Sequence, residues 1–80
     1  MRTITVEYFA ILREQRGLSR ERLSTAAGTT AALYDALRSE HGFTLPGERV
    51  RAAVNGQFVG AQTDLNEGDE VVFIPPVAGG

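Results

Sequence analysis

The chain contains one clear helical pattern, and strand-like segments lie on both sides of it. Within residues 31–41, apolar or weakly polar side chains recur at the spacing that places them on one face of an α-helix. These positions are Leu33, Ala36, Leu37 and His41. Thr29 or Thr30 is suited to cap the N-terminus of this helix, and Gly42 is suited to end it. A single helix among several strands limits the fold to a sheet that is covered on one face.

Five segments have the composition and alternation that are typical of β-strands. They are residues 3–8, 18–24, 49–54, 57–59 and 70–74. A short helical turn is predicted for residues 9–16, ending at Gly17. Asn55-Gly56 is a strong hairpin signal between the third and fourth strands. Pro75-Pro76 must end the last strand, because proline cannot donate to a ladder.

This order of elements predicts an α+β fold of the β-grasp, or ubiquitin-like, type. We expect a mixed sheet of about five strands with one main helix packed on one face. The first and last strands should lie side by side and parallel at its centre. We interpret residues 1–80 as a single domain in which 75–80 form a flexible, extended C-terminal tail.

The composition leaves few side chains for catalysis. The chain has no Cys, no Lys and one His, which excludes thiol nucleophiles, Schiff bases and a metal site with two His ligands. The net charge is −2, and the eight Arg residues are scattered, which argues against nucleic-acid binding. No apolar run approaches the length of a membrane span. We therefore expect a cytoplasmic protein that binds no metal or cofactor of its own.

Several polar residues admit a functional and a structural interpretation. We expect the acidic residues before the last strand to form a solvated turn rather than a metal site; they are Asp64, Glu67, Asp69 and Glu70. His41 is expected to lie at a helix end without a chemical role. Tyr34 and Asp35 are expected at the surface or its boundary.

The six C-terminal residues are the most informative part of the sequence. Pro75 and Pro76 favour an extended path, and the side chains then become smaller through Val77, Ala78, Gly79 and Gly80. Six extended residues reach about 20 Å, which is enough to enter the active site of a partner. Terminal glycines have no β-carbon to clash with a narrow channel. The tail therefore has the form of a narrowing tether whose tip is the Gly80 carboxylate.

A free α-carboxylate is ionised and unreactive at pH 7, because its pKa is about 3.3–3.7. An ATP-dependent partner can convert it to an acyl-adenylate, and a sulfur nucleophile can then displace AMP and leave a thiocarboxylate. The chain lacks the groups to carry out the ATP step itself. We expect Gly80 to be activated by a partner and then to donate sulfur.

Four sequence blocks together resemble the small subunit of molybdopterin synthase. They are Phe9-Ala10-Ile11-Leu12-Arg13-Glu14 followed by Gly17, Ala53-Val54-Asn55, Gly68-Asp69-Glu70-Val71, and Phe73-Ile74-Pro75-Pro76-Val77-Ala78-Gly79-Gly80. The resemblance implies adenylation of Gly80 by a ubiquitin-activating-like adenylyltransferase that consumes ATP. It also implies sulfur loading from a donor such as a cysteine desulfurase system.

The same resemblance implies that the chain is the non-catalytic, sulfur-donating subunit of a heterotetramer. The large subunit would bind the pyranopterin precursor, carry the catalytic residues and receive residues 75–79 in its active site, where the dithiolene of molybdopterin forms. Docking in this family uses an apolar patch beside the tail. The matching positions are Phe9, Phe58 and Ile74, with Arg13 as a polar neighbour. Many members have Phe at the position of Ile74, and core packing is an alternative role for Phe9 and Phe58.

Three other functions remain open from the sequence. The chain could carry sulfur for another product, such as thiamine thiazole, a sulfur amino acid or thiolated tRNA. It could be a non-covalent β-grasp adaptor with an inert tail. It could also be a protein modifier, since the activation step is shared.

Overall fold

The computed structural model describes residues 1–76, so the predictions for Val77, Ala78, Gly79 and Gly80 lie outside the described part. It contains five strands, two α-helices and one 3₁₀ turn in that part. The elements in chain order are β1 (Arg2–Tyr8), α1 (Ala10–Arg16), β2 (Arg20–Thr25), α2 (Thr30–His41), η1 (Gly47–Arg49), β3 (Arg51–Val54), β4 (Gln57–Val59) and β5 (Glu70–Ile74).

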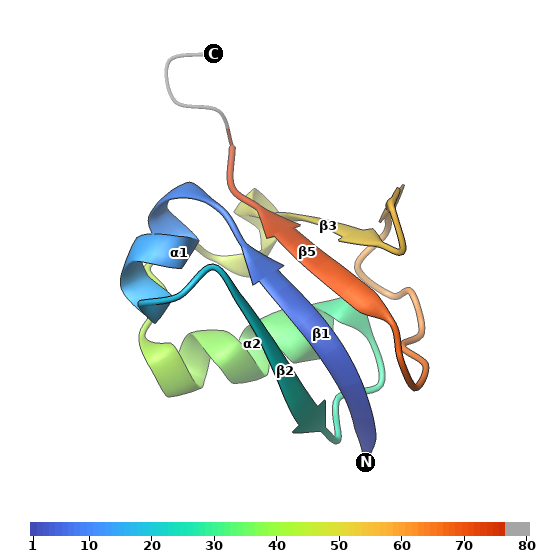
Figure 1. Ribbon diagram of the computed structural model, residues 1–80. Helices are drawn as coiled ribbons and strands as arrows, with labels where there is room; N and C mark the ends of the chain where they lie inside the picture. The colour runs from blue at the N-terminus through green and yellow to red at the C-terminus, as the bar shows by residue number, and fades with distance from the viewer. Residues whose placement is uncertain (77–80) are drawn as a thin grey trace.

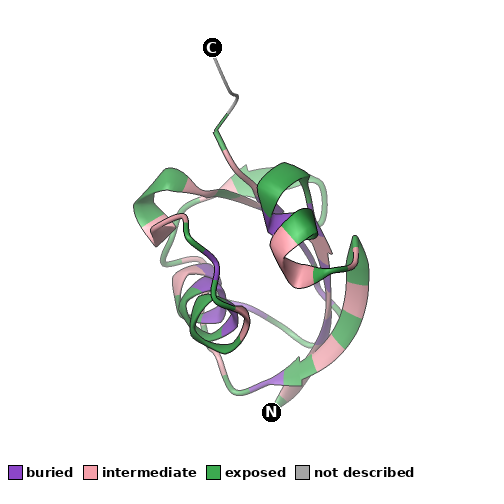
Figure 2. Ribbon diagram, turned by 90° about the vertical axis from the view of Figure 1, so that its left-hand side faces the viewer, coloured by how far each residue is buried: buried purple, intermediate pink, exposed green. Residues whose placement is uncertain are grey.

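The strands form one mixed sheet in the order β2-β1-β5-β3-β4. β1 and β5 are parallel neighbours at its centre, and the other pairs are antiparallel. Helix α2 crosses one face of the sheet (Figure 1), and its buried residues turn toward the strands (Figure 2). The predicted β-grasp fold is confirmed, including the central parallel pair.

Helix α2 forms where the sequence predicts it. The Thr29 hydroxyl accepts a hydrogen bond from the Ala32 amide at 3.2 Å, and Gly42 ends the helix with a φ of 73°. The predicted buried face is wrong at Ala36, which is exposed, and at His41, which is only half-buried. The buried stripe runs through Thr30, Leu33, Tyr34 and Leu37. Tyr34 is therefore a core residue, whereas we expected it at the surface or its boundary. Its ring is enclosed by Phe43 and Phe73, and its hydroxyl donates to the Leu45 carbonyl.

Two strands begin two residues later than the sequence predicts, while the start of β1 and the end of β2 differ from the prediction by one residue each. β2 begins at Arg20 rather than Leu18, since Leu18 packs against the core in the connection from α1. β3 begins at Arg51 rather than Arg49, because residues 47–49 form the 3₁₀ turn η1. The short helix α1 and its left-handed stop at Gly17 are confirmed. The turn between β3 and β4 has positive φ angles at Asn55 and Gly56, as its sequence predicts.

The core fills the space between α2 and the inner face of the sheet. Strand residues Ile4, Val6, Tyr8, Val71 and Phe73 are at most 1% exposed. Tyr8 and Phe43 meet edge to face with ring centroids 5.8 Å apart. Truncating one such buried aromatic side chain to Ala typically costs about 3–5 kcal/mol of stability. This packing fixes the two central strands, and thereby the place where the C-terminal tail begins.

Candidate functional site at the end of the last strand

The stem of the tail leaves the sheet at the end of β5. Phe73 is paired with Tyr8 of β1, and Ile74 is paired with Arg51 of β3, so strands on both sides hold the last residues of β5. Pro75 is half-buried and Pro76 is exposed. The C-terminal ends of the parallel strands β1 and β5 lie at the same end of the sheet, where α1 begins (Figure 1). The stem is therefore a fixed point beside α1.

The outer face of the sheet, which has no helix on it, carries apolar residues near this stem. Side chains alternate along a strand, so Val72 and Ile74 face outward while Val71 and Phe73 face the core. Ala53 is paired with Val72 and with Phe58, which places all three on the outer face. Together these residues form an apolar strip that leads to the tail.

Phe9 and Phe58 are exposed, which excludes core packing as their role. Their exposed fractions are 43% and 57%. Phe9 follows the core residue Tyr8 in an extended conformation, so alternation directs it to the outer face at the level of Ile74. The next residue, Ala10, has a φ of 52°, a left-handed conformation that is unfavourable for a residue with a β-carbon. This turn starts α1 immediately after the exposed Phe9.

Arg51 completes the cluster at the stem. It is exposed, it is paired with Ile74, and its guanidinium carbon lies 4.1 Å from the centroid of the Phe58 ring. A cation over an exposed ring contributes about 0.5–1 kcal/mol. The sequence interpretation did not include Arg51, since its partner across the ladder is known only from the register. We call Phe9, Arg51, Phe58, Val72 and Ile74 the stem patch.

Arg13, the predicted polar neighbour, lies on the exposed side of α1 near the helix C-terminus. It takes part in neither of the two ion pairs among residues 1–76. The structure thus brings the three predicted apolar residues to one face of the sheet and leaves Arg13 on the helix next to it.

A hydrogen-bonded cluster fixes the end of β1 from which Phe9 emerges. The buried Tyr8 hydroxyl donates to Glu21 at 2.6 Å, and Arg16 donates to both oxygens of the same carboxylate at 2.8 Å. The hydrogen bonds from Arg16 hold the pKa of Glu21 below its ordinary value. Burial, followed by the bond to Glu21, raises the pKa of Tyr8. The cluster ties β1, α1 and β2 together.

Asp69 is buried, which corrects the prediction that it belongs to a solvated turn. Only 8% of it is exposed, and its carboxylate accepts hydrogen bonds from the Asn55 side chain and from the Asn66 amide. Asn55 in turn accepts from the Glu70 amide. Asp64, Glu67 and Glu70 are exposed as expected. Among residues 1–76 no group of acidic or His side chains is arranged to hold a metal ion.

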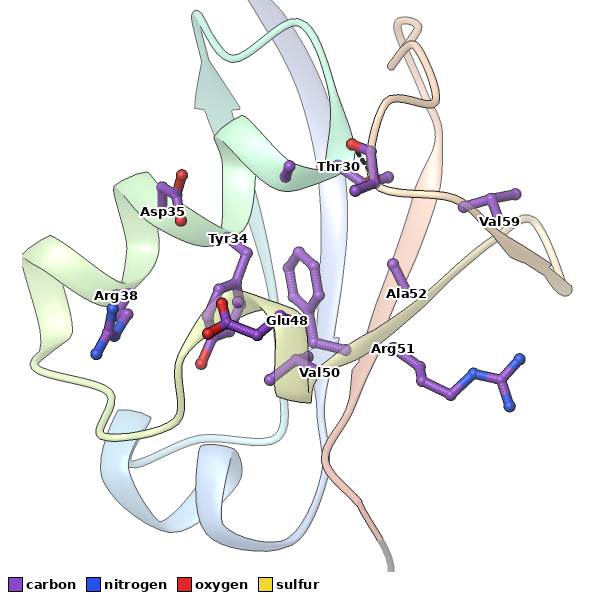
Figure 3. Close-up of a pocket in the computed structure, with 13 residues that line it drawn as sticks. Thr30, Tyr34, Asp35, Arg38, Glu48, Val50, Arg51, Ala52 and Val59 are labelled. Carbon is purple, nitrogen blue, oxygen red and sulfur yellow. Dashed lines mark hydrogen bonds between the residues drawn. The ribbon is translucent and has the colours of Figure 1, made fainter.

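A cleft of about 460 Å³ lies on the opposite side of the sheet, between α2 and the segment from η1 to β4. Tyr34, Ala52 and Phe73 line it, with Asp35 and Glu48 among the polar residues at its border. Figure 3 shows the Arg51 side chain pointing away from this cleft. Arg51 borders both the cleft and the stem patch, but the two lie on opposite faces of the sheet.

None of the helices in the described residues is long and apolar enough to cross a membrane. The fold and the position of the tail stem define a ubiquitin-like β-grasp protein.

The chain belongs to the ThiS family, whose model matches residues 6–80, and so to the ubiquitin-like sulfur carriers. It is 34% identical, over 80 residues, to the molybdopterin synthase sulfur carrier subunit of Escherichia coli strain K12, a match that covers 96% of this chain and 99% of that protein. The resemblance inferred from the sequence is confirmed.

Three solved structures extend the comparison. A putative molybdopterin converting factor subunit 1 from Pyrococcus furiosus is 28% identical with a TM-score of 0.80, covering 96% of this chain and 100% of that one. SAMP1 from Haloferax volcanii is 26% identical with a TM-score of 0.77, covering 98% and 99%. A complex of subunits 1 and 2 of the Helicobacter pylori molybdopterin-converting factor contains the same fold, with a TM-score of 0.67, 23% identity and coverage of 98% and 99%.

Proposed function

We propose that this chain is the sulfur-carrying small subunit of a molybdopterin synthase, with Gly80 as the carrier residue. The observation that carries the proposal is the similarity to the Escherichia coli sulfur carrier subunit along nearly the whole of both chains. The Gly79-Gly80 ending adds support, because the chemistry expected of it needs only a carboxylate that a partner can reach.

In this proposal a partner adenylyltransferase activates the Gly80 carboxylate. The carboxylate oxygen attacks the α-phosphate of ATP, pyrophosphate leaves, and an acyl-adenylate forms. A sulfur donor, such as a cysteine desulfurase system, then displaces AMP. Sulfide leaves a thiocarboxylate directly, whereas a persulfide leaves an acyl disulfide that a thiol reduces to the thiocarboxylate. ATP is bound and consumed by the partner, and the chain itself needs no metal or cofactor.

The large subunit of the synthase receives the loaded tail. We propose that the stem patch, together with Arg13, docks on that subunit and that residues 75–79 enter its active site. The exposure of Phe9 and Phe58 supports this, because apolar rings at the surface gain most from being covered by a partner. The thiocarboxylate sulfur then attacks a carbon of the pyranopterin precursor, displaces an oxygen substituent there and forms a thioester. Water hydrolyses the acyl–sulfur bond, so the sulfur stays on the pterin and the chain returns with a free carboxylate. Assembly as a heterotetramer and location in the cytoplasm remain predictions.

A reconstituted synthase reaction tests this role. Thiocarboxylated chain and the large subunit encoded in the same genome are mixed with the pyranopterin precursor, and molybdopterin formation is followed. We expect product to form in proportion to the thiocarboxylate supplied, and none with the chain lacking Gly79 and Gly80. Loaded chain that yields no product with an active large subunit would contradict the assignment.

A second candidate is a protein modifier, which the similarity to SAMP1, a small archaeal modifier protein, supports. The activation step is the same, but the product is an isopeptide bond to a lysine of another protein. Mass spectrometry of cellular proteins for lysines that carry the C-terminal residues of this chain separates the two. We expect no such conjugates, because the higher identity is to the sulfur carrier subunit.

A further inference from the structure

Arg51 is the charged residue of the stem patch, and it lies beside the start of the tail. It lies directly across the ladder from Ile74, the last residue of β5. It is also the diagonal neighbour of Phe58, since Phe58 is paired with Ala53 two residues further along β3. Its guanidinium carbon stands 4.1 Å from the Phe58 ring centroid. The side chain is thus an exposed cation set between two apolar residues.

Stacking leaves the hydrogen-bonding capacity of Arg51 largely unused. A guanidinium that stacks on a ring uses its flat face, while its N–H donors point outward in the plane of the group. Among residues 1–76, both ion pairs involve other arginines, namely Arg16 with Glu21 and Arg20 with Glu70. None of the side-chain hydrogen bonds in that part of the chain comes from Arg51. Arg51 is exposed, and its N–H donors have no side-chain or carboxylate partner among residues 1–76.

We propose that Arg51 determines partner specificity, and that the large subunit presents an Asp or Glu carboxylate beside an apolar patch to receive it. This inference rests on the proposed function, since it names the surface that the tail-receiving subunit must offer. The carboxylate would take two in-plane hydrogen bonds from Arg51 while apolar side chains cover Phe58 and Ile74. Stacking on Phe58 restricts the guanidinium beforehand, so less conformational entropy is lost on docking.

The surroundings of Arg51 favour a protein carboxylate over a phosphate. Nucleic acids and other polyphosphates are bound by clustered cations, whereas this chain carries a net charge of −2 and scatters its eight arginines. The neighbours of Arg51 on the outer face are Ile74 and Phe58, which are apolar. A single cation in an apolar setting is complementary to a single carboxylate at the edge of a protein interface.

Binding of the large subunit to variants of the full chain tests the inference. Affinity is measured by calorimetry at several salt concentrations for the wild type and for Arg51→Gln, Arg51→Lys and Arg51→Glu. The matched control is Arg22→Gln, because Arg22 is an exposed arginine on β2, far across the sheet from the stem. Thermal unfolding of each variant verifies that the fold is retained.

We expect Arg51→Gln to weaken binding by about tenfold or more, as for a lost hydrogen bond to a charged group. Arg51→Glu should weaken it further, and Arg51→Lys should lie between the wild type and Arg51→Gln. The salt dependence of binding should fall in Arg51→Gln and stay unchanged in Arg22→Gln. Equal affinities of Arg51→Gln and the wild type would overturn the inference about Arg51 and leave the proposed function standing.

A parallel titration with the activating enzyme checks the choice of partner. A loss of affinity for that enzyme, with unchanged affinity for the large subunit, would overturn the assignment of the carboxylate to the large subunit. Failure of the wild-type chain to bind the large subunit at all would instead overturn the proposed function, and the inference with it.

Discussion

Asn55 and Asp69 are joined by a hydrogen bond of 3.0 Å from the Asn55 side-chain amide to a carboxylate oxygen of Asp69. The bond connects the β3–β4 turn to the start of β5. The other Asp69 oxygen accepts a hydrogen bond from the Asn66 amide at 2.8 Å. The same buried carboxylate therefore also stabilises the loop that precedes β5. β5 is thereby fixed at its beginning, while its end is fixed between Tyr8 and Arg51 through the ladder.

Replacing Asp69 with Asn should therefore destabilise the fold. The amide oxygen of an Asn can accept from Asn55 or from the Asn66 amide, and the amide NH₂ then faces a second donor. We expect the free energy of unfolding to fall by about 1–3 kcal/mol, as for an unsatisfied buried polar group. Urea denaturation measures the change, and Asp64→Asn at an exposed position is the control. Equal losses in the two variants would contradict the role assigned to Asp69.

The Tyr8–Glu21–Arg16 cluster should make the free energy of unfolding depend on pH in the acidic range. The pKa of Glu21 is lowered in the folded state, so its contribution is fully present above the unfolded pKa of 4.5 and is lost as the pH falls through the folded pKa. Glu21→Gln should be less stable than the wild type at pH 7, and the difference should shrink below about pH 4.5. Denaturation at a series of pH values measures it. A difference that stays constant down to pH 2 would show that the charge of Glu21 is not involved.

Replacing Ala10 with Gly should stabilise the fold, whereas an Ala-to-Gly substitution in a helix usually destabilises it. The φ of 52° at Ala10 disfavours a β-carbon, so Ala10→Gly should raise the free energy of unfolding by about 0.5–1 kcal/mol. Ala36→Gly is the matched control on the exposed side of α2 and should lower it by about 1 kcal/mol. Thermal or urea unfolding gives both values. A loss in Ala10→Gly as large as that in Ala36→Gly would contradict the left-handed conformation.

Phe9 and Phe58 should matter for docking and not for folding. Both are exposed, so Phe9→Ala and Phe58→Ala should change the free energy of unfolding by less than about 1 kcal/mol. Each should weaken binding to the large subunit by about tenfold or more. Calorimetric titration and urea unfolding of the same preparations give the two quantities. A variant that loses stability while keeping its affinity would show that the ring belongs to the fold.

The element order could be predicted because each signal is local. The Asn55-Gly56 turn, the capping threonine and Gly17 act through their own backbone conformations, and all three appear where the sequence places them. The exposure of Phe9 also follows from strand alternation.

The remaining features depend on contacts between segments that are distant in sequence. Tyr34 is buried because Phe43 and Phe73 enclose it, which helical spacing alone does not indicate. Asp69 is buried because Asn55 reaches it from another turn. Arg51 joins the stem patch only through the register of β3 with β5, and its stacking on Phe58 requires β4 as a third strand.

The most direct test of the account is the intact mass of the chain after incubation with ATP, the activating enzyme and a sulfur source. We predict that the wild type exchanges one oxygen for one sulfur and that fragmentation assigns the exchange to Gly80. The chain without Gly79 and Gly80 should remain unchanged under the same conditions. A wild-type chain that gains no sulfur, while an established substrate of the same enzyme is loaded in parallel, would contradict the central claim.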